Sequence, residues 1–128
     1  MTAVFLHNWD SKESMIADFE GTYGVDNLTP EQIAKYDHVD VILASYGTDN
    51  YSGGAFVLFR NKNDGKLYEN HGSHCSCYGL EDQWGEEPCD IESLKHRVTE
   101  GSLGSDEYCD NVFKDEIRQV IHELELVQ

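Results

Sequence analysis

Cysteine and histidine residues are concentrated in one short stretch of this chain. The twenty residues from Asn70 to Cys89 hold three of its four cysteines and two of its six histidines. Thiolate and imidazole groups are the ligands that zinc prefers, and closely spaced ligands on a turn hold the metal at low cost in chain entropy. The stretch therefore predicts a bound zinc ion.

The predicted zinc has four protein ligands and a structural role. Cys75 and Cys77 are two residues apart, so an extended chain presents both thiols on one face. Cys89 returns after eleven intervening residues, and a histidine completes a Cys₃His set, a common structural arrangement. The predicted ligands are His74, Cys75, Cys77 and Cys89, with His71 and His96 as alternatives. Buried thiols beside exposed histidines are the other interpretation, because free cysteine is among the most buried residue types.

Zinc catalysis is a separate hypothesis for the same residues. It requires an open coordination position and a general base, for which Glu81 or Glu69 is available. The sequence contains neither His-Glu-x-x-His nor the His-x-Glu and Pro-Cys-x-x-Cys pair of zinc deaminases. We therefore predict that the protein is not an enzyme, with a small zinc-dependent enzyme as the alternative.

The chain is strongly acidic. It has 25 Asp and Glu against 9 Lys and Arg, a formal net charge of −16 and a pI near 4.4. Such a charge repels nucleic acids and anionic membranes and attracts basic surfaces, although it also serves solubility alone. Residues 81–92 include six acidic residues and no basic one. The predicted partner-binding residues are Glu81, Asp82, Glu86 and Glu87, together with the carboxylates of the last helix.

The sequence shows no membrane or export signal. No apolar run approaches the roughly 18–20 residues of a spanning helix, and residues 1–6 lack the basic flank of a signal peptide. We therefore expect a cytoplasmic protein. In a reducing compartment, the four cysteines favour metal ligation or burial over disulfides.

Strand patterns occupy the middle of the chain. Residues 39–46 and 55–60 are apolar and β-branched, and residues 66–70 resume the pattern after an Asp-Gly turn. This order predicts an antiparallel meander, with a fourth short strand that carries Cys75 and Cys77.

Helix patterns flank these strands. Helices are expected from about 11 to 20 and, with Thr29 as N-cap, from 30 to about 36. Asp90 is expected to cap a helix over 91–99, and Ser105 a longer one whose apolar stripe includes Cys109. The chain is thus predicted to be a single domain, 1–128, of the α+β class: a small antiparallel β-sheet of three to four strands covered by helices, with a zinc-stapled turn.

The central part of the sequence resembles a known group of proteins. The runs Ala55-Phe-Val-Leu-Phe-Arg60, Gly65-Lys-Leu-Tyr-Glu69 and Gly72-Ser-His-Cys-Ser-Cys-Tyr-Gly-Leu-Glu81, followed by Gln83-Trp84, look like an uncharacterised family of small proteins of bacteriophages and their hosts. The resemblance covers roughly residues 37–98. That family often has a Glu-Pro-Glu type of sequence in the region where this chain has Cys89, so His74, Cys75 and Cys77 are the firmer ligands.

In size and charge, the chain is also similar to anti-CRISPR proteins, in particular to metal-bound inhibitors of type II nucleases. The resemblance implies a small acidic inhibitor in the host cytoplasm that binds a basic host nucleic-acid-processing protein, such as a CRISPR nuclease, and blocks its nucleic-acid site. It implies no direct binding of nucleic acid or membrane. A non-enzymatic structural or regulatory phage protein is a further alternative.

Overall fold

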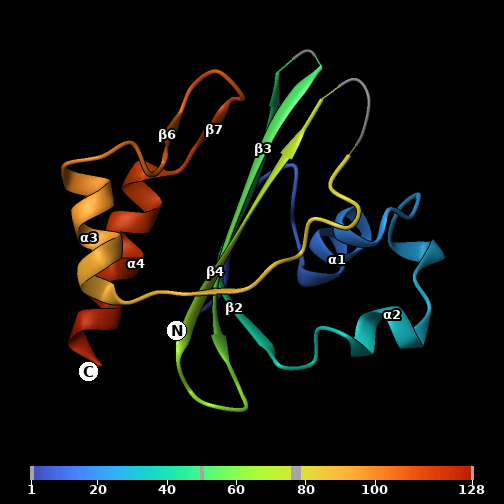
Figure 1. The fold of residues 1–128 in the computed structure, drawn as a ribbon, viewed down its shortest axis with the longest axis horizontal. Coiled ribbons are helices and arrows are strands. Elements are labelled where there is room, and N and C mark those ends of the chain that lie inside the picture. The colour runs from blue at the N-terminus through green and yellow to red at the C-terminus, as the bar shows by residue number, and fades with distance from the viewer. Residues whose placement is uncertain (1, 50, 76–78, 128) are drawn as a thin grey trace.

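A five-stranded sheet forms the centre of the computed structural model, which describes residues 2–49, 51–75 and 79–127. Its strands lie side by side in chain order: β1 (Val4–His7), β2 (Val39–Asp49), β3 (Ser52–Asn61), β4 (Leu67–His74) and β5 (Glu87–Pro88). Helices α1 (Lys12–Glu20) and α2 (Pro30–Ala34) lie on one side of this sheet, and α3 (Ile91–Thr99) and α4 (Lys114–Leu126) lie on the other (Figure 1). The α+β class is therefore confirmed.

The predicted antiparallel meander is formed by β2, β3 and β4. β2 pairs with β3 from Val39 opposite Asn61 onward, and β4 pairs with β3 along its length. At the turn between β3 and β4, the Asn61 amide donates to the Lys66 carbonyl and Gly65 has φ 73°. This left-handed backbone suits glycine, which is the physical reason for the Asp-Gly signal.

The sheet is mixed rather than purely antiparallel, because β1 runs parallel to β2. Val4 lies opposite Leu43, and His7 lies opposite Tyr46. Between these strands the chain crosses one face of the sheet through α1, the 3₁₀ turn η1 (Val25–Asn27) and α2, as a parallel connection requires. The sheet also exceeds the predicted three to four strands, because the short edge strands β1 and β5 have little strand pattern of their own.

Local capping signals set the starts of the first two helices. Ser11 accepts a hydrogen bond from the Ser14 amide and starts α1, and Thr29 accepts one from the Gln32 amide and starts α2. Each side chain at the third helical position bonds back to its cap, which completes a capping box. Gly21, at φ 71°, then ends α1.

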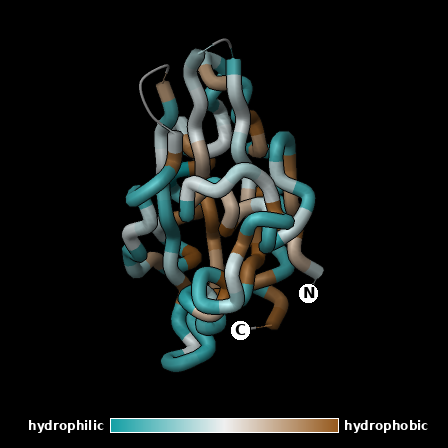
Figure 2. The backbone as a smooth tube through the Cα atoms, turned by 90° about the vertical axis from the view of Figure 1, so that its right-hand side faces the viewer, coloured by the Kyte–Doolittle hydropathy of each residue, from teal (hydrophilic) through white to brown (hydrophobic). Residues whose placement is uncertain are grey.

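Each face of the sheet has its own hydrophobic core. A bulge between Val41 and Leu43 changes the register of β2, so that Val41 and Ala44 pack on the α1 side while Ile42 and Leu43 pack on the α3–α4 side. Hydrophobic residues accordingly follow the strands in the middle of the molecule, and hydrophilic residues prevail at the outer turns (Figure 2).

The C-terminal segment corrects one helix prediction. Asp90 caps α3 as expected, but the last helix begins at Lys114 instead of after Ser105. Residues 105–112 instead form a small hairpin of β6 (Ser105–Asp106) and β7 (Asn111–Val112), with Cys109 in its turn region. Cys109 therefore does not belong to the apolar stripe of α4, which is formed by Ile117, Val120, Ile121 and Leu124. Among the described residues, no helix is long and apolar enough to span a bilayer.

Residues 79–90 link the two sides of the molecule. In Figure 1 this segment runs beside α1 and then crosses the sheet to reach α3. It contains the predicted partner-binding residues and one of the predicted zinc ligands, so its path decides which of these side chains can meet.

Candidate functional site

His74 ends β4 and faces the α1 side of the sheet. It lines an open pocket of about 290 Å³ together with Asp18, Tyr46 and Glu81. Its Nδ1 atom is buried and has no hydrogen-bond partner among the residues that the structure describes. Burial raises the pKa of Asp18, although the indole N–H of Trp9 donates to its carboxylate at 2.7 Å and opposes that shift.

Cys75 directly follows His74, the last residue of β4, and is partly buried. Cys77, the third predicted ligand, lies outside the described residues.

Cys89 lies near the other end of β4. Its amide donates to the Leu67 carbonyl at 3.1 Å, and its side chain lies beside Glu69. Five residues of strand separate Glu69 from His74, roughly 17 Å, whereas a zinc–thiolate bond is only about 2.3 Å long. The structure therefore does not bring Cys89 to His74 and Cys75.

The Cys89 thiol lies partly buried beside the Glu69 carboxylate. Burial raises the pKa of this thiol to about 12, and the negative charge of Glu69 contributes to the shift. Within residues 2–49, 51–75 and 79–127, no group of three or more His, Cys, Asp or Glu side chains is placed to hold a metal ion.

The alternative ligands also have other positions. Nε2 of His71 donates to the Glu69 carboxylate at 2.6 Å, and the His71 ring lies 5.2 Å from that of Phe56 on the α3–α4 side. His96 is exposed on α3. Glu69, considered above as a general base, is instead buried and bound by two side chains, so it is not free to accept a proton from a substrate.

The acidic segment is fixed to the sheet by uncharged side chains. Leu80 is buried and packs into the α1-side core. Gln83 acts like an extra strand partner: its amide nitrogen donates to the Ser73 carbonyl at 2.7 Å, and its amide oxygen accepts from the Ser73 N–H at 2.8 Å. Farther along, the Gly85 amide donates to the Asn70 side chain at 2.6 Å.

Trp84 is the central anchor of this segment. Its ring lies 5.0 Å from Phe19, 5.1 Å from Tyr36 and 5.6 Å from Phe59, measured between ring centroids. Its indole N–H donates to the Glu86 carboxylate at 2.9 Å. The segment is therefore held by aromatic packing from α1, from the residues after α2 and from β3.

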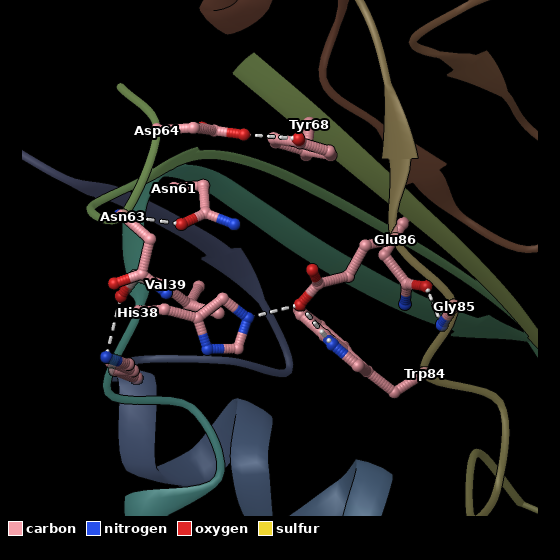
Figure 3. Close-up of polar contacts among 11 residues, drawn as sticks. His38, Val39, Asn61, Asn63, Asp64, Tyr68, Trp84, Gly85 and Glu86 are labelled. Carbon is pink, nitrogen blue, oxygen red and sulfur yellow. Dashed lines mark hydrogen bonds and ion pairs between the residues drawn. The ribbon is translucent and has the colours of Figure 1, made fainter. Parts of the chain in front are cut away.

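His38 joins Trp84 at the same carboxylate. Its Nε2 lies 2.5 Å from Oε2 of Glu86, so both rings point at one carboxylate oxygen (Figure 3). This contact joins the end of the crossover segment to the acidic segment, 48 residues later in the chain. No sequence motif surrounds His38, so this role was missed, and only the tertiary structure shows it.

The predicted partner-binding carboxylates fall into two groups. Glu86 is partly buried and bonded to His38 and Trp84, as described above. Glu81, Asp82 and Glu87 are exposed, and no described Lys, Arg or His lies within ion-pair distance of them. Asp82 has φ 64°, a left-handed conformation that Asp tolerates. We name the segment from Gly79 to Glu87, which carries these four carboxylates, the anchored acidic loop.

The carboxylates of the last helix are not part of the same surface. The anchored acidic loop packs on α1 through Leu80 and Trp84, whereas α4 covers the opposite face of the sheet (Figure 1). The predicted binding face is thus divided by the sheet, and the loop side is the part whose geometry is fixed by the contacts above.

A second pocket opens beside the anchored acidic loop. It has a volume of about 480 Å³ and lies between α1, the segment after α2 and the loop. Its walls combine three aromatic rings with acidic and basic side chains; the lining residues are Phe19, Glu20, Lys35, Tyr36, His38, Asp82, Trp84 and Glu86.

Comparison with protein-family models, with curated proteins and with solved structures found no match to this chain.

Proposed function

We propose that this protein is a small acidic inhibitor that binds a basic surface of a nucleic-acid-processing protein and so competes with nucleic acid. The observation that carries the proposal is the anchored acidic loop, in which three exposed carboxylates have no described basic partner. The net charge of −16 and the resemblance to small phage proteins, including anti-CRISPR proteins, support the same function.

Rigidity makes this loop suited to binding. A flexible acidic segment loses conformational entropy when it binds, whereas a segment that is already ordered avoids that cost. Leu80, Gln83 and Trp84 hold the loop on the sheet, while Glu81, Asp82 and Glu87 remain at the surface. Negative charges in fixed positions steer a basic partner to one orientation and disfavour acidic or nucleic-acid ligands.

The binding proposal can be tested by neutralising the exposed carboxylates. The combined variant Glu81→Gln, Asp82→Asn and Glu87→Gln should bind a CRISPR nuclease without its guide RNA, used as the basic probe, with slower association and a weaker dependence on salt. A matched control neutralises three exposed acids elsewhere, Glu100→Gln, Glu107→Gln and Asp115→Asn, for the same change in net charge.

Equal loss of binding in both variants would show that net charge acts without a specific surface. Nuclease assays with several CRISPR types then test inhibition: the wild-type protein should reduce DNA binding by at least one of them. If no type is inhibited and no basic protein is bound at low salt, the proposed function is wrong.

Structural zinc remains a second proposal, and it rests on the sequence of residues 71–77. Elemental analysis of purified protein should find about one zinc per chain. Cys75→Ser and Cys77→Ser should each abolish zinc binding, whereas Cys89→Ser and Cys109→Ser should retain it, because Cys89 lies near the opposite end of β4 and Cys109 lies in the β6–β7 hairpin. Protein that contains no zinc and has full thermal stability would exclude the proposal.

A further inference from the structure

The 480 Å³ pocket beside the anchored acidic loop has walls that suit a cationic, planar group. Trp84 is partly exposed and supplies the accessible aromatic ring, while Phe19 and Tyr36, each only 2% exposed, support it edge to face with interplanar angles of 77°. Aromatic faces attract cations through their quadrupoles, and the attraction grows where water is partly excluded. The pocket thus combines an aromatic surface with its acidic residues.

The charges around these rings favour a cation as well. Glu20, Asp82 and Glu86 contribute three carboxylates, and Lys35 contributes the one permanent positive charge among the lining residues. Lys35 already forms an ion pair with Glu20 at 2.9 Å, so it does not neutralise the other two carboxylates. A phosphate or carboxylate ligand would be repelled, whereas a basic side chain would be attracted.

Two acceptors in the pocket are available to a ligand. His38 and Trp84 both bond to Oε2 of Glu86, and no hydrogen bond from a described residue reaches Oε1. Asp82 is exposed, and it forms no ion pair with a described basic residue. A planar guanidinium can donate to such acceptors in pairs while stacking on an aromatic ring, which a lysine ammonium cannot do.

We infer that this pocket receives an arginine side chain of the basic partner. The inference rests on the proposed function and deepens it, since it names the residue type that the acidic face recognises. The volume of about 480 Å³ lies within the range of small-ligand pockets, so one extended side chain and its flanking backbone fit. The exposed carboxylates of the loop then contact further basic residues around this arginine.

Short peptides test the pocket without any partner protein. The probes are three hexapeptides of arginine, lysine and citrulline, of which citrulline is the neutral isostere of arginine. Binding is followed by NMR through the two indole N–H signals. Trp84 lines the pocket, whereas Trp9 is buried on Asp18 and acts as an internal control.

The arginine peptide should shift the Trp84 signal and leave that of Trp9 unchanged. The lysine peptide should bind about threefold to tenfold more weakly, and the citrulline peptide should cause no shift. Asp82→Asn should weaken arginine binding about threefold to tenfold. Asn also tolerates the left-handed backbone at this position, so the variant should fold. Glu100→Gln is the charge-matched control and should bind like the wild type.

The outcomes separate this inference from the proposed function. Equal binding of the lysine and arginine peptides, or a Trp84 signal that does not move, would overturn the arginine pocket even if the protein inhibits a nuclease. Arginine-selective binding at Trp84, with no nuclease inhibited and no basic protein bound at low salt, would support the pocket and overturn the proposed function. A Glu86→Gln variant with an unchanged melting temperature and unchanged peptide affinity would also contradict the inference.

Discussion

At the scale of single residues, Glu69 is the carboxylate most tightly held by the fold. Its side chain is only 5% exposed, and both of its oxygens accept hydrogen bonds from Arg97 of α3. His71 contacts one of the same oxygens. Burial by itself would raise the pKa of Glu69, but the bonds to Arg97 and His71 outweigh it and lower the pKa to about 2. The Glu69–Arg97 ion pair thus links α3 to β4.

The low pKa of Glu69 predicts how stability depends on pH. A carboxyl group with a lowered pKa in the folded state stabilises the protein fully above its unfolded value near 4.5 and loses this contribution as the pH falls toward 2. Glu69→Gln should therefore reduce the free energy of unfolding by about 2–3 kcal/mol at pH 7. The stability of the Glu69→Gln variant should also fall less steeply than that of the wild type between pH 4.5 and 2.

Urea unfolding at a series of pH values measures both effects. Glu87→Gln is a suitable control, because Glu87 is exposed and has no described ion-pair partner, so its removal should change stability by less than about 0.5 kcal/mol. A Glu69→Gln protein that unfolds in acid as steeply as the wild type would contradict the assigned pKa.

At the scale of elements, the β6–β7 hairpin is held by its close approach to the central sheet. Asn111 is buried and accepts a hydrogen bond from Ser45 of β2. A Cβ atom on Gly47 would lie 2.2 Å from the Asp110 carbonyl oxygen, so glycine is required there for steric reasons. Gly47 of β2 therefore allows the β6–β7 hairpin to pack onto the sheet.

This contact predicts the effect of adding a methyl group. Gly47→Ala should destabilise the protein by about 1–3 kcal/mol, because the neighbouring atoms are backbone and cannot rotate away. Hydrogen exchange should become faster in the β6–β7 hairpin than in β3. Gly85→Ala is the matched control: apart from the adjoining residues of the chain, no described atom lies within 4 Å of its Cβ position, and stability should change little. Equal stability of both variants would argue against the close packing of the hairpin.

At the scale of the whole molecule, the charge is unevenly compensated. Among the described residues, the basic side chains that form ion pairs with carboxylates are Lys35, His38, His71, Lys95 and Arg97. Most of the 25 acidic residues therefore lack such a partner. Repulsion among like charges opposes the compact state, and dissolved salt screens it over a Debye length of roughly 8–10 Å at physiological ionic strength.

Salt should accordingly stabilise the isolated protein while it weakens binding to a basic partner. Raising NaCl from low to physiological concentration should increase the melting temperature by on the order of 3–6 °C, which corresponds to about 1 kcal/mol in a domain of this size. The variant Glu100→Gln, Glu107→Gln and Asp115→Asn is less negative, with a net charge of −13 instead of −16, and its melting temperature should rise less with salt. A melting temperature that falls with NaCl would contradict this account of the charge.

The sequence by itself determined the parts of this protein that depend on neighbouring residues. The capping signals at Thr29 and Asp90 predicted where two helices begin, because a cap bonds only to backbone one turn away. The Asp-Gly turn and the β-branched runs fixed the β2–β3–β4 meander for the same local reason. Acidity of residues 81–92 was likewise evident from composition, whereas zinc and the partner stay predictions.

Only the tertiary structure decided which distant side chains meet. It paired β1 with β2 across the helical crossover, placed His38 on Glu86, and put Cys89 beside Glu69 instead of beside His74. Cys89 and His74 lie apart because a strand of eight residues holds its two ends far from each other. Such contacts depend on how whole elements pack, which no local pattern in the sequence specifies.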